Sequence, residues 1–283
     1  MKKKLAISLE THDRIKGYLE AFIETTVREI KNRKISDFGN SKTYLNQESR
    51  TGYLKPFHAA IIPPEILRIN AFERSFSSTL GTTFEECARL IALDHHEIVE
   101  RNHDLSGEVS LAGINEIDHQ VASFENVNLA VGGIKPTFQQ IIDAIFRSQR
   151  SDDKEIRSSR ADLYIKTYQG IEYFFEMKSP KPNKGQCLEV LQRILRFHLI
   201  KQGRRPELQT YYAMSYNPYG SSKTAYRWSM AKSYLPFEEI VLIGQEFWNI
   251  IGGPTTNQEL LEIYHEVGHD KSKFIIDSLA FGF

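Results

Sequence analysis

The feature that most restricts the fold of this 283-residue chain is a predicted β-hairpin in its second half. Two runs rich in β-branched and aromatic residues, Arg160–Thr167 and Ile171–Lys178, flank the short connection Tyr168–Gly170. Such runs around a glycine-containing turn are typical of two paired antiparallel strands. Pro180 and Pro182 follow the second run and end it, because proline cannot donate a hydrogen bond to a neighbouring strand.

The register of this hairpin decides where its charged side chains lie. With a three-residue loop and Gly170 in the left-handed conformation, Asp162 lies directly opposite Glu176. Lys178 then shares their face, because side chains alternate along a strand. A two-residue loop would instead pair Asp162 with Met177 and place the two carboxylates on opposite faces. We expect the three-residue form.

Facing carboxylates indicate a metal site. Two neighbouring carboxylates repel each other unless a cation lies between them, and Mg²⁺ prefers such oxygen ligands. With Lys178 on the same face to orient a water molecule, Asp162 and Glu176 form a set suited to metal-assisted phosphodiester hydrolysis. The spacing alone fits equally well an amphipathic surface hairpin in which Glu176 and Lys178 form an ion pair.

Helical and extended patterns alternate along the rest of the chain. Apolar residues recur at helical spacing over Ile15–Ile30. A new helix is expected to begin at Gly81–Glu86, where a threonine precedes a glutamate by three residues. The pattern between Asn102 and Pro136 is irregular. Further helices are expected at Glu65–Phe76, Phe138–Phe146, Gln186–Ile200 and Asn257–His265 or a little beyond, and strands at Thr210–Ser215 and Glu239–Gly244.

This alternation predicts an α/β fold with a mixed central sheet flanked by helices. We expect a mainly helical N-terminal region over residues 1–70, packed on a core over residues 71–283 in a single structural domain. No apolar run reaches the ~18 residues of a spanning helix, so no membrane partner is expected. Cys87 and Cys187 are too few for a disulfide scaffold, which favours a reducing, cytoplasmic location.

The formal net charge of zero, from 36 basic and 36 acidic residues, hides two opposed blocks. Over Thr82–Asn126, ten acidic residues stand against two basic ones, a balance of −8. Over Lys178–Arg205, eight basic residues stand against one acidic residue, a balance of +7. Such blocks are commonly solvated helix faces. The basic block directly follows the predicted catalytic strand, however, so the net charge does not exclude a nucleic-acid partner.

Three segments together resemble a known nuclease superfamily. Asp162, thirteen intervening residues and then Glu176-Met177-Lys178 resemble the PD-(D/E)xK signature, with Ala161 in place of the proline. Upstream, Gly81–Glu85 resembles the Gly-x-x-x-Glu helix that precedes the sheet in this superfamily. Downstream, Ile243–Gly253 is similar to a late segment of many type II restriction endonucleases.

The run Ser179–Gln186 is similar to the group of restriction endonucleases that reads GGNCC, and the whole resemblance spans about residues 75–275. It implies a restriction-endonuclease-like core and a Mg²⁺-dependent type II restriction endonuclease. Such an enzyme cuts double-stranded DNA at a short palindrome and leaves 5′-phosphate and 3′-hydroxyl ends. A symmetric site implies a homodimer, and restriction implies a cognate DNA methyltransferase in the same host. A DNA repair or junction-resolving nuclease with the same core is the first alternative.

The resemblance also assigns roles to single residues. Asp162, Glu176 and Glu85 are the implied metal ligands, with Glu86 as the rival of Glu85. Lys178 is implied to position the attacking water. These four residues, Asp162, Glu176, Lys178 and Glu85, are the predicted catalytic set.

The basic block next to this set indicates phosphate contacts, because Lys and Arg supply most of them. Arg193 and Arg196 share one helix face at i, i+3 spacing. The polar stretch Tyr216–Arg227 is either a base-reading loop or a plain surface loop. The candidate DNA-binding residues are Lys181, Asn183, Lys184, Gln186, Arg193, Arg196, Asn217 and Arg227.

A motif of a different enzyme class lies near the C-terminus. His265-Glu266-Val267-Gly268-His269 matches the HExxH pattern of zinc metallopeptidases, in which two histidines one helical turn apart bind the metal. The fourteen residues after His269 contain neither histidine nor glutamate as a third ligand. Gly268 and the charged pair Asp270-Lys271 also indicate that the helix ends there. A zinc peptidase therefore remains the alternative outside the nucleases.

Overall fold

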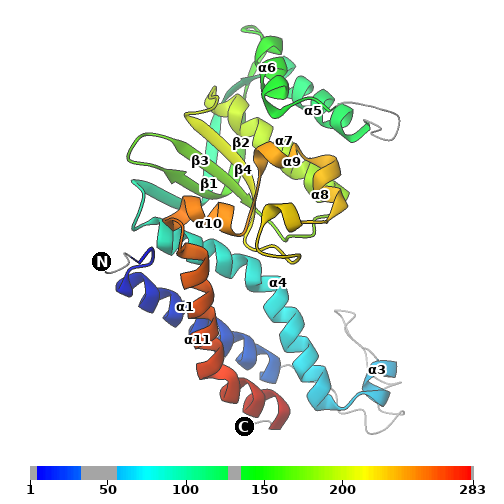
Figure 1. The fold of residues 1–283 in the computed structure, drawn as a ribbon. Helices are drawn as coiled ribbons and strands as arrows, with labels where there is room; N and C mark the ends of the chain where they lie inside the picture. Colours follow the sequence, from blue (N-terminus) through cyan, green and yellow to red (C-terminus); the bar gives the residue numbers. More distant parts are fainter. Residues whose placement is uncertain (1–4, 33–55, 127–134, 282–283) are drawn as a thin grey trace. The chain divides into compact units, whose positions relative to one another are not determined.

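The computed structural model describes residues 5–32, 56–126 and 135–281 (Figure 1). The chain divides into two compact units. A sheet unit comprises Met1–Thr11 and Phe84–Glu259, and a helical unit comprises His12–Thr83 and Leu260–Phe283. The predicted domain boundary at residue 70 remains a prediction, since a division by packing does not test which parts fold independently.

The sheet unit is built on five strands in the order β1-β2-β3-β4-β5 (Figure 1). The first three strands are antiparallel neighbours, whereas β3, β4 and β5 are parallel to one another. The predicted mixed sheet is therefore confirmed. The strands are β1 (Ile98–Ser110), β2 (Lys154–Lys166), β3 (Glu172–Met177), β4 (Leu208–Met214) and β5 (Val241–Ile243).

Helices cover both faces of this sheet. Phe197 of α7 stacks on Phe174 at a centroid distance of 5.0 Å, while Phe247 of α10 contacts the next strand residue, Phe175, at 5.5 Å. Because neighbouring strand residues point to opposite faces, α7 and α10 lie on opposite sides. The helices of this unit are α5 (Leu111–Asn126), α6 (Phe138–Ser148), α7 (Lys184–Lys201), α8 (Ser229–Tyr234), α9 (Phe237–Ile240) and α10 (Gln245–Gly252), with a 3₁₀ turn at Lys223–Ala225.

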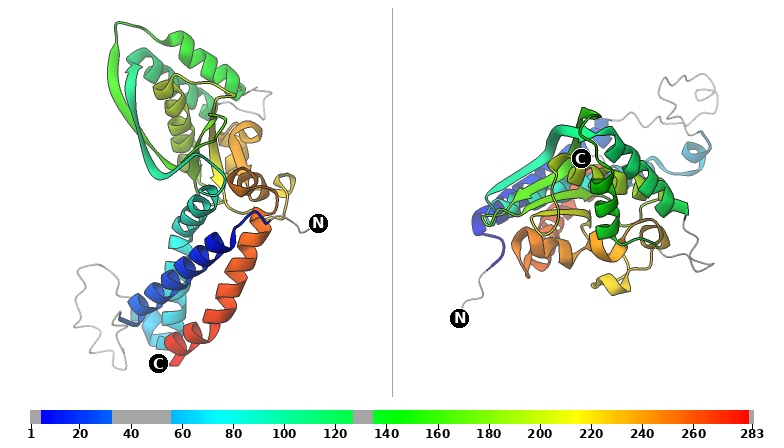
Figure 2. Two further views of the ribbon diagram at one scale, coloured as in Figure 1. Left: turned by 90° about the vertical axis from the view of Figure 1, so that its left-hand side faces the viewer. Right: turned by 90° about the horizontal axis from the view of Figure 1, so that it is seen from above.

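The helix α7 forms the crossover between the parallel strands β3 and β4 (Figure 2). Asn183 caps its first turn: the Asn183 side chain accepts a hydrogen bond from the Gln186 backbone N–H at 2.9 Å, and the Gln186 side chain bonds the Asn183 backbone in return. Leu191 and Leu195 are fully buried, as their spacing predicts. A short connection and a strong cap therefore fix where this helix starts relative to β3.

The helical unit contains most of α1 (Leu9–Asn32), α3 (Pro56–Ile61), the first part of α4 (Pro64–Ala92) and most of α11 (Thr256–Ile276), followed by a π-helical turn at Asp277–Phe281. The predicted apolar stripe of α1 is confirmed, because Ile15, Val27 and Ile30 are at most 1% exposed. None of the helices among the described residues is both long and apolar enough to cross a membrane.

Four of the sequence-based expectations about helices and strands differ from the structure. No helix begins at Gly81–Glu86, because α4 runs without a break through this segment and the Thr83 hydroxyl donates to the Leu80 carbonyl instead of capping. The irregular stretch after Asn102 holds the long strand β1 and helix α5. Residues 237–240 form α9, which shortens the predicted fifth strand to Val241–Ile243. The helix α11 continues past Gly268 to Ile276.

The hairpin register is the predicted one. Leu163 pairs with Phe175 and Lys166 with Glu172, and the same register places Asp162 across from Glu176. The loop between the strands has three residues, closed by a hydrogen bond from the Thr167 N–H to the Ile171 carbonyl at 2.9 Å. Gly170 has a φ of +84°, so its left-handed conformation is confirmed.

Gly170→Val tests how far this loop stabilises the hairpin. A β-branched residue at positive φ costs about 1–2 kcal/mol, and Gly170→Asn should cost clearly less because asparagine tolerates this conformation. Both tryptophans, Trp228 and Trp248, lie in the sheet unit, so their fluorescence during urea unfolding reports this unit. Equal stability of the parent, the valine variant and the asparagine variant would show that the loop conformation does not matter.

Candidate active site

The predicted catalytic residues meet where β3 ends beside the longer strand β2. The strand β2 is paired with β1 from Lys154 to Lys166, whereas β3 is paired only with its final segment, Leu163–Lys166. Asp162 lies at this fork. Its Oδ2 accepts a hydrogen bond from the Met177 backbone N–H at 2.8 Å and another from the Lys178 ammonium group at 2.8 Å. The end of β3 is thus tied to the side chain of Asp162.

Glu176 is the most deeply placed member of the set, with none of its surface exposed. Its Oε2 accepts a hydrogen bond from Nη1 of Arg193 at 2.7 Å and lies 3.5 Å from the Lys178 ammonium nitrogen. Its Oε1 is buried and has no hydrogen-bond partner among the described residues. Asp162 and Glu176 therefore both face Lys178, and one oxygen of Glu176 is left for a further ligand.

Burial and mutual repulsion dominate the electrostatics of this pair. Burial raises the pKa of Glu176 to about 8, and the negative charge of Asp162 contributes in the same direction. Burial lowers the pKa of Lys178, but attraction to Asp162 and Glu176 outweighs it, so that the net pKa of Lys178 lies above its ordinary value. Without a metal, Lys178 is therefore an ammonium ion that can donate hydrogen bonds.

Glu85 and Glu86 approach the site from α4. Arg101 of β1 binds both, with Nη2 at 2.9 Å from Glu85 and Nη1 at 2.9 Å from Glu86. Burial raises the pKa of Glu85, and the charge of Asp162 raises it further against the opposing effect of Arg101. The pKa of Glu86 is lowered, chiefly by its hydrogen bond to Arg89. Of the two glutamates, Glu85 is thus the one that senses the charge of Asp162.

Arg101 was not among the predicted site residues, because it lies in the stretch without clear periodicity. One signal pointed to it: Arg89 and Arg101 are the two basic residues of the acidic block. Both bind Glu86, and Arg101 also binds Glu85. A rare cation within an acidic block is thus a candidate partner for carboxylates near the site.

The residues fit a divalent cation held by few protein ligands. The unpartnered Oε1 of Glu176 and the carboxylate of Asp162 are hard oxygen donors of the kind that Mg²⁺ prefers. In the described part of the chain, no group of three or more histidine, cysteine, aspartate or glutamate side chains forms a ready metal cage. Such a site suits Mg²⁺, which usually takes one or two carboxylates and completes its shell with water and phosphate oxygens.

Comparison with known proteins identifies the family. The family model described as type II restriction endonuclease, HinfI, matches residues 15–268. Three type II restriction enzymes of Herpetosiphon aurantiacus are similar over nearly their whole length. HgiEI is 46% and HgiBI 45% identical over 278 residues, which cover 97% of this chain and 99% of each relative. HgiCII is 43% identical over 275 residues, covering 97% of this chain and 100% of the relative.

The chain belongs to the HinfI family of type II restriction endonucleases. It is therefore a nuclease of restriction–modification systems, and its substrate is double-stranded DNA. Restriction endonucleases of this type generally use divalent metal ions, in keeping with the donor set around Asp162 and Glu176. The restriction-endonuclease-like α/β fold expected from the sequence is confirmed.

The candidate DNA-binding residues of this restriction endonuclease fall into two groups. In the first group, polar atoms already have partners within the chain. Asn183 and Gln186 cap α7, and Asn217 closes its own loop by bonding the Tyr219 N–H at 2.9 Å and the Ser222 carbonyl at 2.7 Å. Lys184 binds Glu125 at 2.5 Å. Arg193 binds Glu176 and Glu189.

The second group is open to a ligand. Lys181 is exposed, with its ammonium group 5.5 Å from the ring centroid of Tyr219. Arg196, half-buried on α7, and Arg227, exposed after the loop, have no ion-pair partner within the described residues. These three cations remain predicted phosphate or base contacts.

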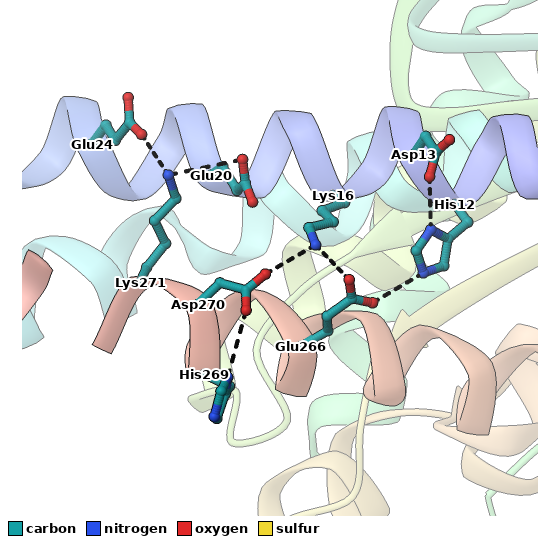
Figure 3. A network of polar contacts seen from close by, with 9 residues as sticks. All are labelled: His12, Asp13, Lys16, Glu20, Glu24, Glu266, His269, Asp270 and Lys271. Atoms are coloured by element: carbon teal, nitrogen blue, oxygen red, sulfur yellow. Dashed lines mark hydrogen bonds and ion pairs between the residues drawn. The ribbon is translucent and has the colours of Figure 1, made fainter. Parts of the chain in front are cut away.

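The HExxH segment lies on a continuous helix but serves a different purpose. Figure 3 shows Glu266 and Asp270 of α11 both bound to Lys16 of α1, with Asp270 at 2.9 Å. His269 is 86% exposed and contacts Asp270. The glutamate that a zinc peptidase would use as a base is thus engaged in an ion-pair network between α1 and α11.

The raised pKa of Glu176 predicts a pH-dependent stability of the metal-free enzyme. Its pKa in the folded chain, about 8, lies above the ordinary value of 4.5, so the folded state binds this proton more tightly. The contribution of Glu176 to the free energy of unfolding is therefore fully present below pH 4.5 and is lost as the pH rises through 8. Glu176→Gln should therefore remove this loss and stabilise the metal-free protein by roughly 1–3 kcal/mol at pH 9, measured by urea unfolding.

Glu172→Gln is the matched control on the same strand. Burial raises the pKa of Glu172, but its bonds to Lys201 at 2.8 Å and to the Tyr164 hydroxyl at 2.7 Å outweigh this, and the net pKa is lowered. Its contribution is therefore present above the ordinary pKa and lost as the pH falls, so this variant should destabilise the protein at pH 7. If both variants changed the free energy of unfolding in the same direction at pH 9, the opposite pKa shifts assigned to Glu176 and Glu172 would be contradicted.

Proposed function

We propose that this chain is a Mg²⁺-dependent type II restriction endonuclease that hydrolyses both strands at a short palindrome, with GGNCC as the candidate site. The products carry 5′-phosphate and 3′-hydroxyl ends. The observation that supports it most is the convergence of Asp162 and Glu176 on the Lys178 ammonium group, beside a buried and unpartnered carboxylate oxygen. The support for GGNCC is the sequence resemblance of Ser179–Gln186 alone.

Asp162 and Glu176 hold the metal in this proposal, and Glu85 completes the acidic set from α4. Bound Mg²⁺ supplies a Lewis acid that polarises the phosphodiester and lowers the pKa of a water molecule. Arg101 pairs with both Glu85 and Glu86 and so limits repulsion among the carboxylates.

Lys178 positions the attacking water and stabilises the negative charge that develops on the phosphate. An ammonium ion with a raised pKa donates hydrogen bonds but does not accept the proton of the water. Its Nζ is held by Asp162 at 2.8 Å, which fixes the direction of the remaining N–H groups. The lysine therefore acts by orientation and charge.

In this proposal, the DNA phosphates are bound by basic side chains that form no ion pair within the described residues. Lys181 follows the catalytic strand, Arg196 lies on α7 and Arg227 follows the loop after β4. Such contacts fix the register on DNA and make the affinity salt-dependent.

A palindromic site calls for two copies of the active site related by two-fold symmetry, hence a homodimer. A cognate DNA methyltransferase then protects the same site in the host. A cytoplasmic location is part of the proposal and is supported by Cys87 and Cys187, two buried thiols that are too few for a disulfide scaffold.

The test is cleavage of plasmid DNA that carries GGNCC sites. With Mg²⁺ the parent should give discrete fragments, and EDTA should abolish them. Lys178→Ala should lower the cleavage rate by at least ~10²-fold, the range expected for losing a charge-stabilising group. Lys166→Ala is the matched control, because Lys166 lies four residues beyond Asp162 at the loop end of β2 and its ammonium group is 3.4 Å from Glu97.

Sequencing of the fragment ends gives the site and the cut position. Fragments that end at another palindrome would correct GGNCC and keep the metal site. Cleavage that persists in EDTA, or a Lys178→Ala enzyme as fast as Lys166→Ala, would contradict the proposed mechanism.

A further inference from the structure

Arg193 belongs to the basic block predicted to contact phosphates, but in the fold it lies over Glu176. The helix α7 leads from β3 to the parallel strand β4, so it runs back across β3. Phe197 stacks on Phe174 at 5.0 Å. Four residues back along α7 are ~6 Å, and two residues forward along β3 are ~6.6 Å. Arg193 is therefore brought over Glu176 by the same packing that brings Phe197 over Phe174.

Both terminal nitrogens of the Arg193 guanidinium group bind carboxylates at this place. Its Nη1 donates to Oε2 of Glu176 at 2.7 Å, and its Nη2 donates to Oε1 of Glu189 at 2.8 Å. The side chain is 28% exposed. Arg196, one turn further on, has no such partner within the described residues. The two arginines of one helix face are thus in different states, and Arg193 is the less suited to a phosphate.

The two carboxylate oxygens of Glu176 also differ in their hydrogen-bond partners. Oε2 accepts a hydrogen bond from Arg193 and lies near Lys178, whereas Oε1 is buried and has no partner in the part of the chain that the structure describes. A buried carboxylate oxygen without a hydrogen bond is costly, so an uncompensated one indicates a missing ligand. Holding Oε2 in place fixes the direction in which Oε1 points.

We propose that Arg193 is a positioning residue, which holds Oε2 of Glu176 so that Oε1 is presented to the divalent metal, and that it is not a phosphate contact. This inference rests on the proposed metal site. Arg193 affects metal binding by orienting Glu176 more than by repelling the metal, because Glu189, at 2.8 Å, offsets the charge of the guanidinium group. Groups that orient metal ligands typically affect metal affinity by about 10- to 100-fold.

The test compares Arg193→Met with Arg196→Met in two binding measurements without turnover. Mn²⁺ binding to the DNA-free protein is measured by calorimetry, and binding to a DNA duplex is measured in EDTA at several salt concentrations. Arg193→Met should bind Mn²⁺ about 10- to 100-fold more weakly and keep the salt dependence of the parent. Arg196→Met should bind Mn²⁺ like the parent.

Three results would overturn the inference. One is unchanged or tighter Mn²⁺ binding by Arg193→Met. Another is a salt dependence of this variant reduced by about 0.9 in the slope of log K against log salt, the mark of one lost phosphate contact. The third is equal weakening of Mn²⁺ binding by Arg196→Met. A parent protein that binds no Mn²⁺ would instead contradict the proposed metal site, so the two failures are distinguishable.

Arg193→Lys keeps the test decisive if the methionine variant does not fold, as circular dichroism would show. Lysine retains the charge but lacks the planar fork that holds Glu176 and Glu189 together. We expect it to bind Mn²⁺ about 3- to 10-fold more weakly than the parent, below the range for full removal of an orienting group. Parent-like Mn²⁺ affinity in this variant would overturn the inference.

Discussion

The burial of one carboxylate, that of Glu176, is the constraint on which the rest of the site depends. A carboxylate without any exposed surface must be matched by cations and hydrogen bonds, or it takes up a proton. Lys178 comes from its own strand and Arg193 from the crossover helix α7. The hairpin register, the end of β3 and the packing of α7 must all be correct for these groups to meet.

The sheet forks at the same place, beside the buried carboxylate. The strand β3 ends at Met177, whose N–H bonds the Asp162 side chain instead of the backbone of β2. The strand β2 continues alone beside β1, so the carboxylates lie at the point where two strands part. A fork of this kind opens space next to buried side chains without breaking the core beneath it, where Phe174 and Phe175 are fully buried.

The sequence predicted those parts of the fold that local chemistry decides. Gly170 and the alternating runs around it favoured the observed register, and the leucine spacing located α7, whereas the Asn183 cap that begins this helix was not predicted. The predicted helix start at Gly81 was wrong, because a glycine inside a helix costs only about 1 kcal/mol. The packing of Cys87 and the buried residues after it outweighs that cost. A capping pattern is thus weak evidence inside a long helix.

Spacing also could not distinguish residues of the same type in different surroundings. Arg193 and Arg196 are equivalent in the sequence, yet one binds Glu176 and the other is open to a ligand. Glu266 fits a zinc-peptidase motif, but Lys16, 250 residues away, binds it. The partners in both cases come from other elements, and only the three-dimensional fold brings them together.

The central claim is that one divalent metal binds where β2 and β3 part. Fe²⁺ in place of Mg²⁺, with ascorbate and peroxide, produces hydroxyl radicals that cut the polypeptide next to the bound metal, and mass spectrometry locates the cuts. The account predicts cuts near Asp162 and near Glu176–Lys178, suppressed by excess Mg²⁺. Cuts around His265 and His269 instead, or none that Mg²⁺ suppresses, would contradict it.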